Sequence, residues 1–214
     1  MKKFNVLLFW ILFLVLWMAG TDVTGLLPPG LAPRQFWTGV VGCVMAILCT
    51  RIVLRMEKQS FSDIGLVWEK WTLPRFFLGL GIGAALLFLV LLVIAGFSHR
   101  RLVVLPLDMG KVGDYFILLL LSIAEEVGFR GYPLVTLTRS VGVWMAQLIV
   151  AVAFALYHIA YGWSPVVAFT GPFFWSFAFS LSAVRSKGIA VPVGVHLAVN
   201  IFKGVFMLVG GPGN

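Results

Sequence analysis

The chain has 214 residues, of which 61% are hydrophobic and only 11% are charged, and its mean hydropathy is +1.04. A soluble domain usually carries about 25% charged residues, and so apolar a chain would expose large apolar patches in water. The composition therefore excludes an ordinary soluble domain. The net charge of +8 comes from basic residues at the ends of apolar runs, which is typical of membrane topology signals. We expect the lipid bilayer as a partner and no nucleic acid.

Apolar runs predict an all-α, polytopic membrane helical bundle with about seven transmembrane spans. The spans are expected at about 4–20, 36–54, 76–97, 114–135, 141–161, 166–184 and 189–208. Residues 60–75 are too polar to cross and are expected in the membrane interface, and residues 98–114 are expected to form a polar loop. We predict a single integral-membrane domain over 1–214. Its N-terminal spans and interfacial segment cover about 1–112, and the core that carries the candidate site covers about 113–208.

The first apolar run follows Lys2 and Lys3 and lacks a small-residue cleavage site, so it is predicted to be a retained span. For seven spans with a cytoplasmic N-terminus, ten basic residues fall in cytoplasmic segments and four outside. This bias favours a cytoplasmic N-terminus. The expected location is a bacterial or archaeal cytoplasmic membrane.

A glycine-rich stretch, GLGIG, runs from Gly79 to Gly83 in the third apolar run. It superficially resembles a dinucleotide-binding loop, but it lacks the preceding strand and the spacing of the third glycine. Small residues four apart on a membrane helix let a second helix approach closely. We predict helix packing through Gly79 and Gly83.

Polar side chains that are costly in a membrane gather in the later apolar runs. They are Glu125, Glu126 and Arg130 in the fourth run, His158 in the fifth, and His196 and Asn200 in the seventh. A charged side chain in the membrane interior costs at least a few kcal/mol. A cluster of such residues on three helices therefore indicates a functional site.

Helix spacing assigns provisional roles to these residues. Glu126 and Arg130 are four apart in the favourable acid-first order, so they are expected to pair. This leaves Glu125 without a partner on its own helix, as a candidate general base. His196 and Asn200 share one helix face.

Several hydrolytic sites are absent from the sequence. A zinc site of the H-E-x-x-H type is absent, because His158 is followed by Ile159 and Ala160. The G-x-S-x-G serine motif is also absent, and the aspartates outside the interfacial segment lie in loops or at a span edge. A site built from glutamate and histidine remains.

Three ordered motifs, E-E-x-x-x-R, F-x-x-x-H and H-x-x-x-N, resemble those of the CPBP family, also called Abi. This family includes the type II CaaX prenyl endopeptidases and their bacterial relatives. The motif residues are Glu125, Glu126, Arg130, Phe154, His158, His196 and Asn200. The resemblance covers about residues 114–206 and implies an intramembrane endopeptidase that acts on a membrane-anchored peptide or protein.

The resemblance also implies a role for each motif residue. Glu125 is the implied catalytic base, and with His158 it activates a water molecule. His196 and Asn200 are the implied oxyanion-stabilising pair. The supporting residues are Glu126, Arg130 and Phe154.

Cofactor use is left with two alternatives. Members of the family were long regarded as metalloproteases, because their histidines and glutamates could hold zinc, and later as metal-free glutamate proteases. Asn200 is a poor zinc ligand and a good hydrogen-bond donor to an oxyanion. We favour a site without a cofactor, with zinc as the alternative.

Other functions are compatible with parts of the pattern. A prenylated CaaX protein, a peptide pheromone and a sorting tail are equally compatible substrates. A proton-coupled transporter would use the same buried groups, but transporters usually show paired repeats, and here the polar residues are confined to the second half. A non-catalytic immunity or scaffold membrane protein of the same fold is the remaining alternative.

Overall fold

The computed structural model describes residues 2–28 and 30–210, and it is a helical bundle as predicted. The side chains of Lys2 and Lys3 lie outside this description, so the orientation of the N-terminus stays a prediction. The helices are α1 (Lys2–Thr24), α2 (Arg34–Met56), α3 (Thr72–Ser98), α4 (Val112–Arg130), α5 (Tyr132–Val141), α6 (Val143–Ala160), α7 (Pro165–Thr170), α8 (Pro172–Ser186) and α9 (Ala190–Phe202). Short 3-10 turns lie at η1 (Phe61–Ile64) and η2 (Met109–Lys111), and two strands at β1 (Arg101–Val104) and β2 (Phe206–Val209).

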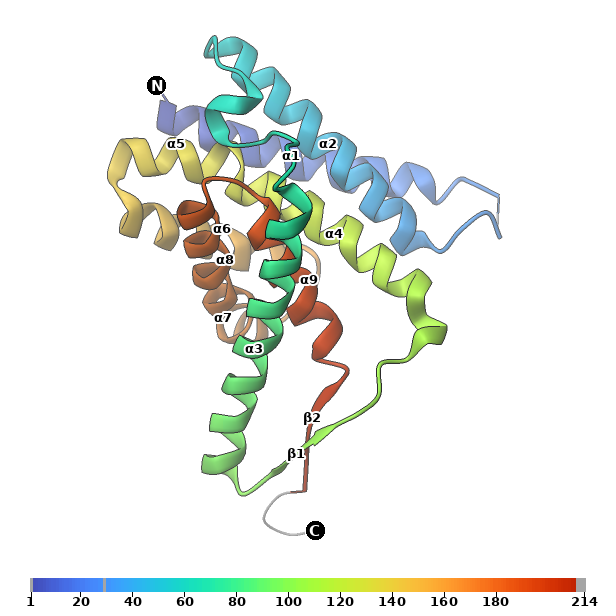
Figure 1. The fold of residues 1–214 in the computed structure, drawn as a ribbon. Coiled ribbons are helices and arrows are strands. Elements are labelled where there is room, and N and C mark those ends of the chain that lie inside the picture. The colour runs from blue at the N-terminus through green and yellow to red at the C-terminus, as the bar shows by residue number, and fades with distance from the viewer. Residues whose placement is uncertain (1, 29, 211–214) are drawn as a thin grey trace.

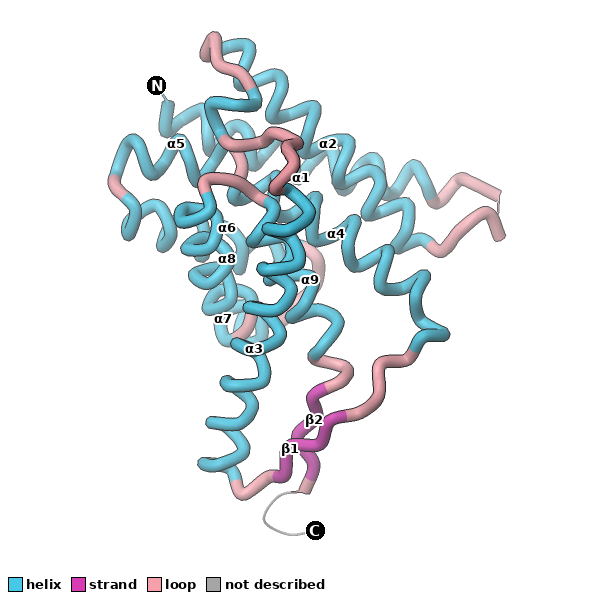
Figure 2. Tube along the Cα trace, in the orientation of Figure 1, coloured by secondary structure: helices cyan, strands magenta, loops and turns pink. Residues whose placement is uncertain are grey.

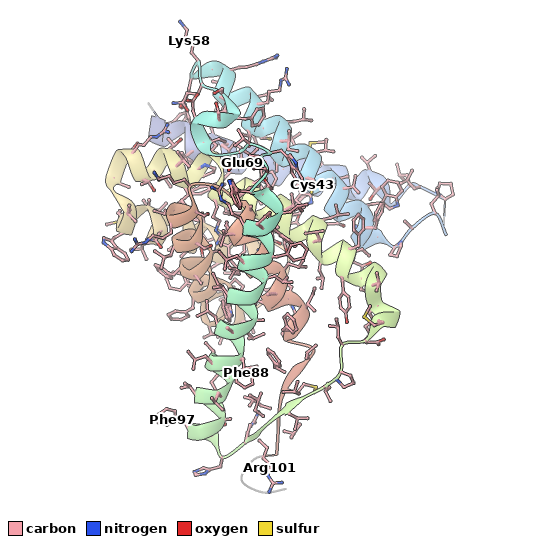
Figure 3. The ribbon with its side chains drawn as sticks, viewed as in Figure 1. Cys43, Lys58, Glu69, Phe88, Phe97 and Arg101 are labelled. Carbon is pink, nitrogen blue, oxygen red and sulfur yellow. The ribbon has the colours of Figure 1, made fainter. Side chains whose placement is uncertain are left out.

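Helix length and exposed apolar surface identify an integral membrane protein. Five helical segments of the described residues are long and apolar enough to cross a membrane, namely α1 from Phe4, α2, α3, α6 and the joined α7–α8 segment. Many of their large side chains face outward, and Phe97 near the end of α3 is 86% exposed (Figure 3). Such a surface suits lipid rather than water. The count of about seven spans stays a prediction, because α9 is apolar but shorter.

Two predicted spans are interrupted. The fourth, expected at 114–135, ends as α4 at Arg130, and α5 starts at Tyr132 with Pro133 in its first turn. The sixth is split at Gly171, immediately before Pro172, into α7 and α8. A proline lacks the backbone N–H that a continuous helix needs and clashes with the preceding turn.

A short sheet replaces parts of two predicted segments. Strand β1 lies in the stretch predicted as a loop at 98–114, and it pairs antiparallel with β2, which lies in the last part of the seventh predicted span. Arg101 pairs with Val209 and Val104 with Phe206. Figure 2 shows the two strands in magenta at the end of the molecule opposite the N-terminus. The predicted helix at 189–208 was therefore too long, because its backbone turns at 203–205 and then extends.

Close packing of α3 and α9 confirms the interpretation of the glycine-rich stretch. A Cβ atom added to Gly79 would collide with the backbone carbonyl of Val191, and one added to Gly83 would collide with the backbone of Val195. From the other side, a Cβ atom on Gly194 would meet the carbonyl of Phe76. Figure 1 shows the two helices side by side. The absence of these side chains lets the two backbones touch, which sets the position of α9.

Helix α1 covers the end of α4. Its buried face includes Phe9, Phe13 and Trp17, all fully buried, at the spacing of one helix face. The ring of Phe13 occupies the space where a Cβ atom of Gly128 would lie. Helices α1 and α2 run alongside each other, and α4 contacts α2 (Figure 1). The N-terminal helices thus form a wall behind the segment that carries both glutamates.

Candidate active site

The predicted site residues of α4 lie in its last two turns, which are fully packed. Every residue from Ala124 to Arg130 is buried. Glu126 is 0% exposed, Arg130 1% and Glu125 8%. Because a buried charge needs a partner, the contacts of these three side chains define the site.

Glu126 and Arg130 form the ion pair expected from their spacing. Arg130 Nη1 lies 3.3 Å from Glu126 Oε1, and both side chains are fully buried. Arg130 Nη2 also donates a 2.7 Å hydrogen bond to Ser176 Oγ on α8. The guanidinium lies 4.3 Å from the ring centre of Phe154 and 5.2 Å from that of Phe179. Such cation–π contacts add to the ion pair in a desolvated site.

His196 on α9 lies between the two glutamates. Its Nδ1 lies 2.7 Å from Glu126 Oε1. His196 therefore donates to the same carboxylate oxygen that pairs with Arg130. Its Nε2 is 3.6 Å from Glu125 Oε2, which is longer than a normal hydrogen bond. Tyr157 on α6 donates a 3.1 Å hydrogen bond to Glu125 Oε1. Glu125 therefore lacks a partner on its own helix, as predicted, but two other helices supply contacts.

His158 occupies the same aromatic environment. Its Nδ1 lies 2.8 Å from the carbonyl oxygen of Phe154. Since a carbonyl only accepts, Nδ1 carries the proton and Nε2 is left free to accept. The ring of Phe154 is 4.6 Å from that of His158 and 6.0 Å from that of His196, so it contacts both. Among the described residues, no hydrogen bond or ion pair joins His158 to Glu125.

Asn200 lies one helical turn after His196 and is half-buried. Its Oδ1 accepts a 3.3 Å hydrogen bond from Nζ of Lys203. This contact orients the amide and leaves its N–H₂ group as an available donor. Asn200 thus shares the face of His196, and within the described part of the chain no hydrogen bond joins it to either glutamate.

Three polar atoms in the cluster are buried without a hydrogen-bond partner, namely Glu125 Oε2, Glu126 Oε2 and Arg130 Nε. Leaving such an atom unpaired costs about 1–3 kcal/mol, and more for a charged group. A water molecule or a polar substrate group that met Glu125 Oε2 would remove part of that cost. The unpaired oxygen is therefore available to a water molecule or to a polar group of a ligand.

Sequence reasoning missed three neighbours of the site. Tyr157 contacts Glu125, Ser176 contacts Arg130, and the ring of Phe179 stacks on His196 at 4.4 Å. Tyr157 directly precedes His158, and a tyrosine hydroxyl in an apolar helix usually needs a polar partner. Ser176 lies in an apolar run without a G-x-S-x-G motif, so the sequence did not link it to the site. Phe179 had no distinguishing signal, because its ring resembles any other apolar side chain of the span.

The donor set was also compared with the needs of a metal. Zinc is usually held by three or four protein ligands. Within the described part of the chain, no three side chains of His, Cys, Asp or Glu are placed to hold one ion together. Glu125, His158 and His196 as arranged here do not fit a zinc site.

Comparison with known families agrees with the motifs. Residues 112–202 match the family described as Type II CAAX prenyl endopeptidase Rce1-like. The matched segment runs from the start of α4 to the end of α9 and contains all seven motif residues. The match confirms the resemblance to the CPBP family over this segment, and the class of protein is a CAAX-type intramembrane protease. No curated protein matches the chain.

Proposed function

We propose that this protein is an intramembrane endopeptidase that hydrolyses a peptide bond of a membrane-associated substrate, with Glu125 as the base that activates water. The observation that carries the proposal is the buried Glu125 carboxylate, which has one oxygen held by Tyr157 and the other unpaired beside His196. A fixed carboxylate with one free oxygen suits general base catalysis, because geometry and basicity are both set before the substrate arrives. The family match supports the class of reaction.

In the proposed reaction a water molecule binds between Glu125 Oε2 and Nε2 of His158. Glu125 takes one proton while the water oxygen attacks the peptide carbonyl carbon, giving a tetrahedral intermediate with a negative oxygen. The protonated Glu125 then donates this proton to the amide nitrogen, and the C–N bond breaks. The products are a carboxylic acid and an amine, and Glu125 is again a carboxylate.

His196 and Asn200 are proposed to stabilise the negative oxygen. Hydrogen-bond donors aimed at the developing charge often supply the largest catalytic effect. Asn200 has a free N–H₂ group, and His196 donates from Nε2 when both of its nitrogen atoms are protonated. Protonation of His196 also balances charge, because two carboxylates and one guanidinium otherwise leave the cluster with a net negative charge. An unbalanced buried charge is costly.

The finer details of substrate and location are also proposals. The proposed substrate is a prenylated CaaX protein, a peptide pheromone or a sorting tail, and the family match supports a membrane-associated substrate. The predicted cytoplasmic N-terminus places the loop after α5 and the loop after α8 on the cytoplasmic side of a bacterial or archaeal membrane. The mechanism proposed here uses no metal, since the donor set does not fit one.

Cleavage of a membrane-anchored reporter peptide by purified protein in liposomes tests the proposal. Prenylated and unprenylated reporters are compared, each with and without a chelator. Glu125→Gln should abolish cleavage, whereas Glu69→Gln, an exposed glutamate outside the site, should leave it unchanged. Full activity of the Glu125→Gln variant would refute the assigned base. Loss of activity with chelator and recovery with zinc would refute the metal-free mechanism, and a folded protein that cleaves no reporter would favour the scaffold alternative.

A further inference from the structure

Two hollows lie side by side at the end of the molecule that carries η1, the α5–α6 connection and the α8–α9 connection. The first has a volume of about 370 Å³ and the second about 570 Å³. Gly65, Lys187 and Gly188 line both hollows. Neither is lined by Glu125, His158 or His196, so both lie outside the proposed reaction centre.

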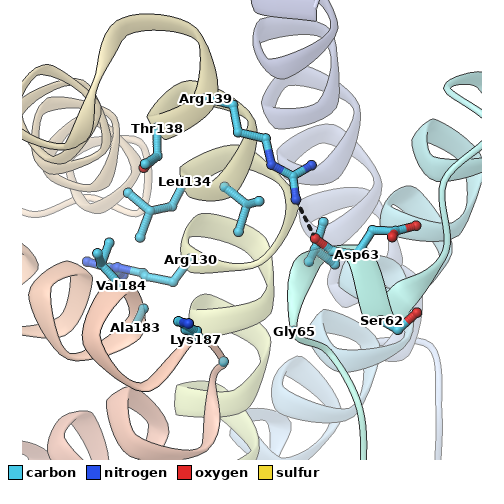
Figure 4. A pocket seen from close by; sticks show the side chains of 13 residues that line it. Ser62, Asp63, Gly65, Arg130, Leu134, Thr138, Arg139, Ala183, Val184 and Lys187 are labelled. Atoms are coloured by element: carbon cyan, nitrogen blue, oxygen red, sulfur yellow. Dashed lines mark hydrogen bonds between the residues drawn. The ribbon is translucent and has the colours of Figure 1, made fainter.

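The first hollow is rich in cations. Its lining includes Arg130, Arg139 and Lys187 against a single carboxylate, Asp63 (Figure 4). Arg130 is already paired with a glutamate. Arg139 and Lys187 are exposed and form no ion pair within the described residues. Arg139 Nη2 donates only to the backbone carbonyl of Asp63, at 2.7 Å. The hollow therefore presents two cations that form no ion pair within the described residues, beside the single carboxylate of Asp63.

Two further side chains of the first hollow, Thr138 and Asp63, affect whether an anion can bind there. The hydroxyl of Thr138, which lines it, is buried without a hydrogen-bond partner and has a proton to donate. The carboxylate of Asp63 is occupied by hydrogen bonds of 2.7 Å from the backbone N–H and the hydroxyl of Ser60. Arg139 and Lys187 outnumber this one carboxylate, so the hollow keeps a net positive charge.

The second hollow is an apolar groove between α2, α4 and the starts of α3 and α9. Ile47, Leu119, Ile123 and Val193 contribute to its lining. At its edge stands Trp68, which is 78% exposed. Tryptophan is enriched where membrane and water meet. A groove of this composition holds a hydrocarbon chain with its polar end toward the cationic hollow.

We propose that the two hollows form a binding site for one anionic phospholipid, with its phosphate against Arg139 and Lys187 and an acyl chain in the groove. Charge complementarity supports this occupant, since Lys187 lines both hollows and Arg139 the first, while the other charged groups of the groove, Arg75 and Glu69, pair with each other. The topology prediction places Arg139 and Lys187 on the cytoplasmic side, where the leaflet surface is negative. The bound lipid links η1 to α5 and to the α8–α9 connection, and so stabilises the end of α4 that carries Arg130.

Lipid titration of the purified full-length chain in neutral detergent tests this site. Phosphatidylglycerol, phosphatidylcholine with the same acyl chains, and glycerol phosphate without chains are added separately, and the Tm is recorded. A ligand that binds only the folded state at free concentration c stabilises it by RT ln(1 + c/Kd), so the Tm rises with ligand concentration and the rise depends on affinity. We expect phosphatidylglycerol to raise the Tm, and the other two ligands to do so only at much higher concentration.

Two variants with matched controls locate the effect. The double variant Arg139→Gln/Lys187→Gln should need a phosphatidylglycerol concentration at least about tenfold higher for the same rise in Tm. Its control, Lys70→Gln/Arg185→Gln, removes two exposed cations that do not line the hollow and should behave as wild type. Ile47→Trp fills the groove and should also weaken binding.

The control for the groove is Leu48→Trp. Ile47 and Leu48 are each 45% exposed, but only Ile47 lines the groove. Equal effects of phosphatidylcholine and phosphatidylglycerol, or equal losses in both charge variants, would overturn the proposal. Glycerol phosphate that acts as strongly as the lipid would also overturn it, in favour of a site for a small anion. If the charge variant does not fold, the pair of tryptophan variants decides the question.

Discussion

The helices before residue 112 and those after it bury different kinds of side chains. In the first part, Thr21 and Thr50 are the buried polar side chains among the described residues, and α1, α2 and α3 are long and continuous. In the second part, two glutamates, an arginine and a histidine are buried, the helix breaks at Gly131 and Gly171, and α5, α7 and α9 are short. The family match covers only the second part.

The two parts therefore have different roles: one carries the charged residues of the candidate site, and the other packs around them. The second part supplies every charged group of the cluster, whereas the first part supplies apolar walls. Helix α1 seals the end of α4 with its aromatic face, and α3 determines how closely α9 approaches. A buried charge network is stable only if its geometry is held tightly. The first part therefore contributes to the site without contributing a reacting group.

The largest expected effect comes from breaking the buried ion pair. Among the described residues, Arg130→Met leaves the buried Glu126 with a hydrogen bond from His196 alone, and such a change typically costs about 3–5 kcal/mol. Thermal unfolding in detergent measures the loss. The double variant Glu126→Gln/Arg130→Met removes both charges and should recover much of the stability. A single variant as stable as wild type would show that the pair does not hold the second part together.

A second test concerns the apolar support from α3. Gly79→Ala places a methyl group against the carbonyl of Val191 and should cost about 1–3 kcal/mol of stability. Gly81 is the matched control on the same helix, because nothing lies within 4 Å of a Cβ atom added there. Gly81→Ala should be neutral or slightly stabilising, since alanine favours a helix over glycine. Equal changes in stability in the two variants would show that close packing of α3 against α9 at Gly79 does not stabilise the site.

The same two parts explain which features the sequence could predict. The spans of the first part were predictable, because each is a continuous apolar run of a length that can cross the bilayer. The sequence did not predict where the helices break, at Gly131 and Gly171. Pro133 and Pro172, in the first turns of the helices that follow, indicate an interruption. The pairing of β1 with β2 joins residues about a hundred positions apart, and neither segment shows a strong strand pattern.

For the candidate site, contacts within one helix were predictable and contacts between helices were not. The pair of Glu126 and Arg130 follows from a spacing of four residues. The position of His196 between both glutamates depends on how α9 crosses α4, which no local pattern encodes. The contact of Tyr157 with Glu125 depends in the same way on the packing of α6.

A third test sharpens the role of the second part by removing one hydrogen bond. Tyr157→Phe takes away the donor to Glu125 Oε1 but keeps the ring that packs beside Trp17 and Phe129. If the hydroxyl positions the base, kcat for reporter cleavage should fall about tenfold while KM changes little. A purely structural role predicts lower stability with unchanged kcat in the folded fraction. Tyr161→Phe, a neighbouring tyrosine that makes no hydrogen bond through its hydroxyl within the described residues, is the control.

The smallest expected effect lies at η1, a segment of the first part that contacts the second part through the hydrogen bond from Arg139 to the backbone carbonyl of Asp63. The backbone N–H and the hydroxyl of Ser60 donate to Asp63, and these hydrogen bonds lower the pKa of the Asp63 carboxyl below its ordinary value of 3.8. A carboxyl whose pKa is lower in the folded state stabilises the fold above pH 3.8, and the effect is lost as the pH falls through the folded-state value. Asp63→Asn should therefore lower the Tm slightly at neutral pH, and the difference from wild type should vanish below that range. A difference in Tm that persists unchanged in acid would show that the carboxylate charge at η1 does not stabilise the connection, and that the two parts are joined by their helix packing alone.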